Sequence, residues 1–134
     1  MAALREFGWG ALLAAAIATG WATAASADAG DYEFRLVSKE VKKGDGVVVA
    51  VRLVHKSSGR AVPDAVIYST RVDMSPDNMP TMIEPAEPLP STEPGVYRFK
   101  TNLTMAGNWA LSLAAKVQGE TGTVQNKLIV KAVR

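Results

Sequence analysis

The chain has 134 residues, no cysteine, one histidine and a formal net charge of +2. A chain of this length holds one domain. The absence of cysteine excludes a disulfide framework, a thiolate metal site and a cysteine nucleophile. A single histidine excludes a multi-histidine zinc or copper site. The basic residues do not cluster along the sequence, so we expect no nucleic-acid partner.

The N-terminal segment predicts a secretory signal peptide. Residues 7–27 are almost wholly apolar or small, Arg5 precedes them, and they end in Ala25-Ser26-Ala27, an A-x-A cleavage pattern. We therefore expect residues 1–27 to be a signal peptide and residues 28–134 to be the mature domain, exported to the periplasm. The alternative is an uncleaved membrane anchor, because the apolar run is long enough to span a bilayer if it is helical.

Alternation of apolar and polar residues predicts strands through most of the mature chain. The predicted strands cover residues 32–36, 47–54, 65–73, 97–103, 109–117 and 124–133. Turn signals such as Gly44-Asp45-Gly46 separate them at a spacing of roughly 8–12 residues, which is typical of sandwiches. The chain shows no helical periodicity, so the pattern predicts an all-β protein, an antiparallel β-sandwich of about seven short strands.

The segment from Met74 to Pro94 interrupts this pattern with six prolines. Each proline removes a backbone donor and fixes φ, so we expect no regular ladder strand here. The segment is predicted to be a long loop or a poorly paired edge. A loop of this length in a small domain is usually functional or disordered.

Catalytic residues are poorly represented, and we expect that the protein is not an enzyme. The lone histidine is His55, and the sequence contains neither a G-x-S-x-G motif nor a glycine-rich phosphate loop. A hydrolytic enzyme would need a carboxylate pair brought together by the fold, and the sequence identifies none.

The methionines are the most informative feature for function. Met74, Met79 and Met82 fall within nine residues, and Met105 directly precedes another turn. Thioether sulfur is a soft, uncharged ligand that suits Cu(I) or Ag(I) and suits zinc, magnesium and calcium badly. It has no proton to lose, so it still binds where thiolates fail. We therefore predict these four methionines as Cu(I) ligands, with His55 as an optional fifth.

Packing is the alternative explanation for the same residues. Methionine is a flexible core filler, and Met105 has the strand parity of Trp109, so it would then cap the core. Met82 and Ile83 would hold the loop against the sheet. Taken alone, His55 is interpreted as a residue at the end of a strand.

A series of short motifs runs from Ala65 through Val130. They comprise a methionine at a strand end, a methionine in the following loop, Gly-x-Tyr, and Met-x-Gly-x-Trp, here Met74, Met79, Gly95, Tyr97, Met105, Gly107 and Trp109. In these features the stretch resembles the YtkA-like (FixH-like) family of small exported domains. The resemblance implies an immunoglobulin-like β-sandwich in the bacterial periplasm and an association with copper or other heavy metals. The loop after Met74 lacks the histidines of some members, which weakens Cu(II) binding more than Cu(I) binding.

Two hypotheses for function follow. The first is a periplasmic Cu(I) carrier or buffer that uses the methionine cluster. The second is a non-catalytic interaction module that docks on an envelope efflux or oxidase-assembly complex, with Pro85–Pro94 as a preformed extended surface. Contact with the membrane is expected only through an uncleaved leader, if at all. Convergence of the four methionines on one accessible edge would favour the first hypothesis.

Overall fold

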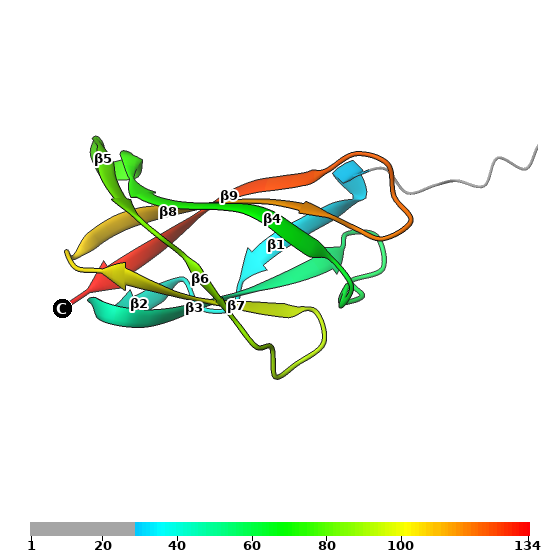
Figure 1. The fold of residues 1–134 in the computed structure, drawn as a ribbon, viewed down its shortest axis with the longest axis horizontal. Helices are drawn as coiled ribbons and strands as arrows, with labels where there is room; N and C mark the ends of the chain where they lie inside the picture. The colour runs from blue at the N-terminus through cyan, green and yellow to red at the C-terminus, as the bar shows by residue number, and fades with distance from the viewer. Residues whose placement is uncertain (1–28) are drawn as a thin grey trace, which may run out of the picture.

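A computed structural model describes residues 29–134 and shows an all-β protein made of two packed sheets (Figure 1). The predicted signal peptide, residues 1–27, lies outside the described residues. The helices of the described chain are two 3₁₀ turns, η1 (Ala29–Asp31) and η2 (Ser75–Asp77). No helix within residues 29–134 is long and apolar enough to cross a membrane.

The strands form one four-stranded and one five-stranded sheet. The four-stranded sheet has the order β1 (Tyr32–Leu36), β3 (Gly44–His55), β7 (Val96–Leu103) and β6 (Glu87–Leu89). The five-stranded sheet has the order β2 (Glu40–Lys42), β9 (Val124–Val133), β8 (Gly107–Lys116), β4 (Val66–Met74) and β5 (Met79–Glu84). All neighbouring strands are antiparallel except β2 and β9, which are parallel. The predicted immunoglobulin-like sandwich is therefore confirmed, with nine strands rather than about seven.

The core lies between the two sheets, where strand alternation predicted it. The inward-facing residues of the long inner strands are buried, among them Val49, Val51 and Leu53 on β3 and Trp109, Leu111 and Leu113 on β8. Successive side chains of a strand point to opposite faces, so one buried face reads as alternation in the sequence. That local rule is sufficient to identify most of the core.

The prediction that no regular ladder strand forms between Met74 and Pro94 is wrong, but its stated alternative, a poorly paired edge, agrees with the structure. Both β5 and β6 lie in this segment, and in β6 Pro88 pairs with Phe99 of β7. Each of these strands is the last of its sheet. Proline is tolerated in edge strands because half of the backbone groups there need no partner. The sequence pattern also missed β2, which has three residues and too little length to show alternation.

The two ends of the sandwich carry different connections (Figure 1). One end holds the β4–β5 connection and the β7–β8 turn, and we call it the methionine end. The first residue of β3, Gly44, pairs with Leu103 of β7 at this end. The last residue of β3, His55, pairs with Tyr32 at the opposite end, beside η1.

Candidate methionine site

Two of the predicted ligands are cross-strand neighbours in the β4–β5 connection. Met74 ends β4 and pairs with Met79, the first residue of β5. The turn η2 joins them, and Asn78 closes it in the left-handed conformation, with φ of 60°. The backbone N–H of Asn78 donates to the carbonyl of Ser75 at 3.0 Å. Asparagine is among the few residues that adopt this conformation readily, so the local sequence favours the turn.

A bulge in β5 adds the third methionine. The pairs Met74–Met79 and Asp73–Ile83 are adjacent on β4, but they leave Pro80 to Met82 as extra residues on β5. In a regular strand, residues three positions apart face opposite sides. The bulge removes that restriction, and both methionines of β5 are half-buried and pack against the core.

The β7–β8 turn lies directly against the β4–β5 connection. A Cβ atom on Gly107, whose φ is +144°, would lie 2.5 Å from Asp77 Oδ2 and 2.8 Å from Met74 Cε. Only glycine fits this approach. The Asp77 carboxylate accepts hydrogen bonds from the Asn108 backbone N–H at 2.8 Å and from Asn108 Nδ2 at 3.1 Å. We call these contacts the Asp77–Asn108 clasp.

Trp109 holds Met105 at the same end. Its indole N–H donates to the carbonyl oxygen of Met105 at 3.0 Å, while the ring is completely buried in the core. The Met-x-Gly-x-Trp spacing therefore has a structural basis. The tryptophan anchors the turn, Gly107 allows close approach to β4, and Met105 projects from the turn.

The four methionines lie at one end but differ in exposure. Met74 is completely buried, Met79 and Met82 are half-buried, and 41% of Met105 is exposed. The idea that Met105 caps the core is wrong, because the residues between β7 and β8 turn the chain and break its strand parity. The four predicted ligands therefore range from completely buried to exposed.

The structure does not bring His55 to the methionines. β3 has 12 residues and is roughly 35 Å long at about 3.3 Å per residue, and His55 lies at its far end. There the ring packs edge-on against Tyr32, with centroids 5.1 Å apart, and His55 Nδ1 lies 3.0 Å from Ser58 Oγ. The optional fifth ligand therefore lies outside this site and acts as a residue at the end of a strand.

The two carboxylates near the methionines are already engaged. Asp73 is buried and accepts hydrogen bonds from Arg71 Nε at 2.6 Å and the Ser75 N–H at 2.8 Å. Burial alone would raise the pKa of Asp73, but the hydrogen bonds from Ser75 and Arg71 lower it to about 2. The backbone and side-chain hydrogen bonds from Asn108 lower the pKa of Asp77. Both groups are ionised at neutral pH, and both oxygens of each have donors.

Four thioether side chains therefore share the methionine end with two carboxylates that already accept hydrogen bonds. Among residues 29–134, no group of three or more histidine, aspartate or glutamate side chains is arranged to hold a metal ion. The donor set therefore suits a soft ion rather than a hard one. The Asp77 carboxylate beside it would favour a cation electrostatically, whereas the charge of Asp73 is already paired with Arg71.

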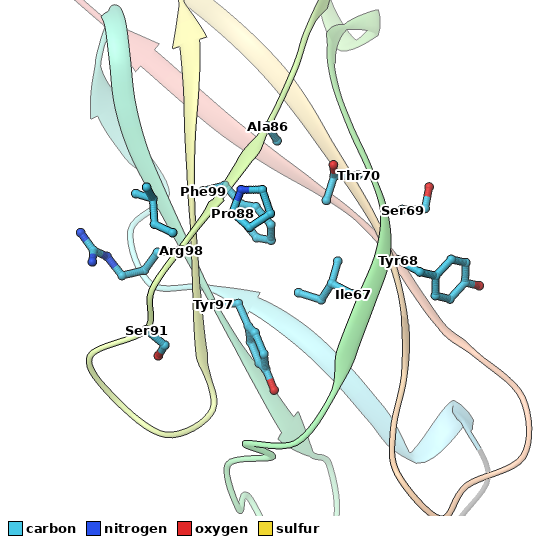
Figure 2. A pocket seen from close by; sticks show the side chains of 11 residues that line it. Ile67, Tyr68, Ser69, Thr70, Ala86, Pro88, Ser91, Tyr97, Arg98 and Phe99 are labelled. Carbon is cyan, nitrogen blue, oxygen red and sulfur yellow. The ribbon is translucent and has the colours of Figure 1, made fainter.

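A groove, which sequence reasoning missed, opens between β4 and the β6–β7 pair. It has a volume of about 360 Å³. Figure 2 shows Ile67 and Thr70 of β4 facing Pro88 and Phe99, whereas Tyr68 points away. The groove lies beside an open sheet edge, because β5 pairs only with residues 72–74 of β4. The proline-rich segment was the signal for this edge, since proline marks strands that end a sheet.

The family comparison agrees with the motif series. A family model described as YtkA-like matches residues 26–114, a range that includes all four methionines. No curated protein matches the chain. Among solved structures, the crystal structure of the Lin-41 filamin domain is 16% identical with a TM-score of 0.49, and the match covers 82% of this chain and 99% of that one. The crystal structure of a conjugative transposon lipoprotein from Bacteroides eggerthii DSM 20697 is 12% identical with a TM-score of 0.34, covering 75% and 96%.

Proposed function

The chain belongs to the YtkA-like family, and we propose that it is a periplasmic protein that binds and carries Cu(I) at its methionine end. One observation carries the proposal. Two connections far apart in the sequence place Met74, Met79, Met82 and Met105 at one end of the sandwich, where the neighbouring carboxylate oxygens already accept hydrogen bonds.

The ligand chemistry supports a soft monovalent ion. Thioethers are neutral, so they bind Cu(I) without first losing a proton, and binding changes little with pH. The ionised carboxylate of Asp77 offsets the positive charge of the ion without ligating it, whereas the charge of Asp73 is paired with Arg71. Zinc, magnesium and calcium would need those oxygens, which already accept hydrogen bonds, or imidazole nitrogen, which lies at the opposite end of the sandwich.

The order of exposure supports carriage rather than permanent storage. Met105 is the exposed methionine and would make the first contact with an arriving ion. Met79 and Met82 are half-buried and would share it, and Met74 would hold its inner side. Neutral ligands near the surface allow the ion to leave for a partner with stronger donors.

A Cu(I) titration against a competing chelator under reducing conditions tests the proposal. The double substitution Met74→Leu and Met105→Leu keeps the side-chain volume nearly constant, so the fold should persist. We expect it to weaken Cu(I) affinity by at least about tenfold, the scale on which metal sites respond to lost support. His55→Gln is the matched control and should leave the affinity unchanged, because His55 lies at the opposite end. Unchanged affinity in the double variant would refute the site, and no binding by the wild type would refute the function.

The groove favours a second candidate function, an interaction module for an envelope protein of an efflux or oxidase-assembly complex. An extended apolar segment of the partner could pair with the open edge of β4 and place alternate side chains in the groove. Pro88 and Leu89 of the proline-rich segment would line its other wall.

This second candidate predicts a different set of sensitive residues. Ile67→Glu puts a charge into the groove and should abolish copurification of the partner. Tyr68→Glu is the matched control, because Tyr68 points away from the groove (Figure 2). Copurification that survives replacement of all four methionines by leucine would favour the module over the carrier, and equal effects of the two glutamates would contradict the groove as the docking site.

A further inference from the structure

The outer face of the five-stranded sheet gathers residues that are scattered in the sequence. We call it the basic face. Its exposed lysines come from three strands and are Lys42 on β2, Lys116 on β8, and Lys127 and Lys131 on β9. The sequence shows no basic cluster, because these lysines span most of the domain. Strand alternation and the β2–β9–β8 order bring them to one side.

The two faces of the sandwich differ in how their charges are paired. Three ion pairs lie on the four-stranded sheet side, Arg35–Glu33, Arg52–Glu93 and Lys100–Glu87. Within residues 29–134, by contrast, Lys116, Lys127 and Lys131 form no ion pair within 4.0 Å. Carboxylates are sparse on the basic face. Asp73 is buried and bound to Arg71, and Glu40 lies opposite Lys131 in the register.

Large apolar side chains accompany the lysines. Four of the seven large hydrophobic residues that are exposed in the described chain belong to β4, β5 or β9 of this sheet, namely Val66 (65%), Tyr68 (54%), Ile83 (50%) and Ile129 (43%). Between them, the outward residues of β8 include small Ala110, Ser112 and Ala114. The longer side chains of the flanking strands therefore project furthest from the sheet.

We propose that the basic face binds the surface of a bilayer that contains anionic phospholipids. The register puts Lys116 near the start of β9 and Lys131 near its end, roughly 25 Å apart along the strand. That spacing is too wide for one small anion and fits an extended charged surface. Lysine near an anionic leaflet and apolar side chains at headgroup level are the two contributions that hold proteins on membranes. The contact is independent of the predicted leader.

Vesicle co-sedimentation tests this proposal with a chain that begins at Asp28, since all nine strands lie beyond that residue. We expect binding to vesicles of 70% phosphatidylcholine and 30% phosphatidylglycerol, little binding to pure phosphatidylcholine, and weaker binding at 300 mM than at 50 mM NaCl. In the triple variant Lys116→Gln, Lys127→Gln, Lys131→Gln, the partition coefficient should fall by about 100-fold. Each lysine near an anionic surface contributes roughly a fivefold factor, and three such factors multiply to this value.

The matched control removes the same charge from the opposite side. The variant Arg35→Gln, Arg52→Gln, Lys100→Gln should lower the partition coefficient only a few-fold, because these side chains belong to the other sheet. Equal losses in the two triple variants would overturn the assignment to the basic face, as would absence of binding to phosphatidylglycerol vesicles. If poly-L-glutamate at equal charge concentration displaces the protein from vesicles, the face prefers an acidic polypeptide and the lipid proposal fails. Urea unfolding of both variants checks that the fold persists.

Discussion

Replacing Gly107 with alanine tests whether the β7–β8 turn must lie this close to the β4–β5 connection. The added Cβ would lie 2.8 Å from Met74 Cε and 2.5 Å from Asp77 Oδ2, and φ at this position is +144°. An L-residue in this region of backbone conformation costs about 1–3 kcal/mol. Forcing a fully buried Met74 aside adds about 1–3 kcal/mol of overpacking. We expect a total loss of about 2–6 kcal/mol in the free energy of unfolding.

Gly119→Ala is the matched control for the backbone contribution. Gly119 also has positive φ, +86°, but a Cβ there would have no heavy atom within 4 Å. This variant should therefore lose only about 1–2 kcal/mol. Urea unfolding of both variants, read as the shift of the midpoint at constant slope, measures the difference. Equal losses would refute the argument that close contact, rather than backbone conformation, requires glycine at position 107.

A double-mutant cycle of Met74→Ala and Gly107→Ala separates the steric cost of the added Cβ from the cost of its backbone conformation. Met74→Ala removes the methyl group that the new Cβ would meet, so Gly107→Ala should cost at least about 1 kcal/mol less in that background. Strict additivity of the two substitutions would show that Met74 and Gly107 do not interact. The Gly107→Ala variant should also bind Cu(I) more weakly than Gly119→Ala, because only the former moves the turn that bears Met105.

Three further outcomes test the energetics of the fold. Because the pKa of Asp73 is lowered from its ordinary value of 3.8 to about 2, its ionised form stabilises the fold by about 2 kcal/mol at neutral pH. This contribution should be lost as pH falls from about 5 to 2, and the pH dependence of urea unfolding should be shallower in Asp73→Asn. Tyr97→Phe should lower the free energy of unfolding by about 1–3 kcal/mol. The Tyr97 hydroxyl accepts from the Ala65 N–H at 3.0 Å and donates to the Val62 carbonyl at 2.7 Å. Thermal unfolding measures the loss, and an unchanged melting temperature would contradict it. Thr101→Val should raise the free energy of unfolding by about 1 kcal/mol, since the buried Oγ1 of Thr101 has no hydrogen-bond partner within residues 29–134. A loss of stability would show that this hydroxyl is hydrogen-bonded.

The sequence was sufficient for the parts of the fold that depend on local pattern. Alternation identified β1, β3, β4, β7, β8 and β9 and their inward faces, because one side of each strand is buried. The motif series led to the YtkA-like family, and the family comparison confirmed it. Thioether chemistry selected the four methionines, and their role as Cu(I) ligands stays a prediction.

Other features depended on where each strand lies in a sheet. The prolines indicated a poorly paired edge, but the partners of β5 and β6 could not be predicted locally, because they depend on where each strand lies in its sheet. The three-residue bulge beside Met82 likewise follows from pairing with β4. The clasp between Asp77 and Asn108 joins residues 31 positions apart, and no local pattern encodes such a contact.

The absence of cysteine and the single histidine left thioether as the main soft donor, and the sequence alone determined that. Only the tertiary structure decided which side chains share a site. It placed Met74, Met79, Met82 and Met105 at one end and His55 at the other, because β3 runs the length of the sandwich between them. It also placed dispersed lysines on one face, because side-chain direction alternates along every strand and the sheet order brings distant strands together.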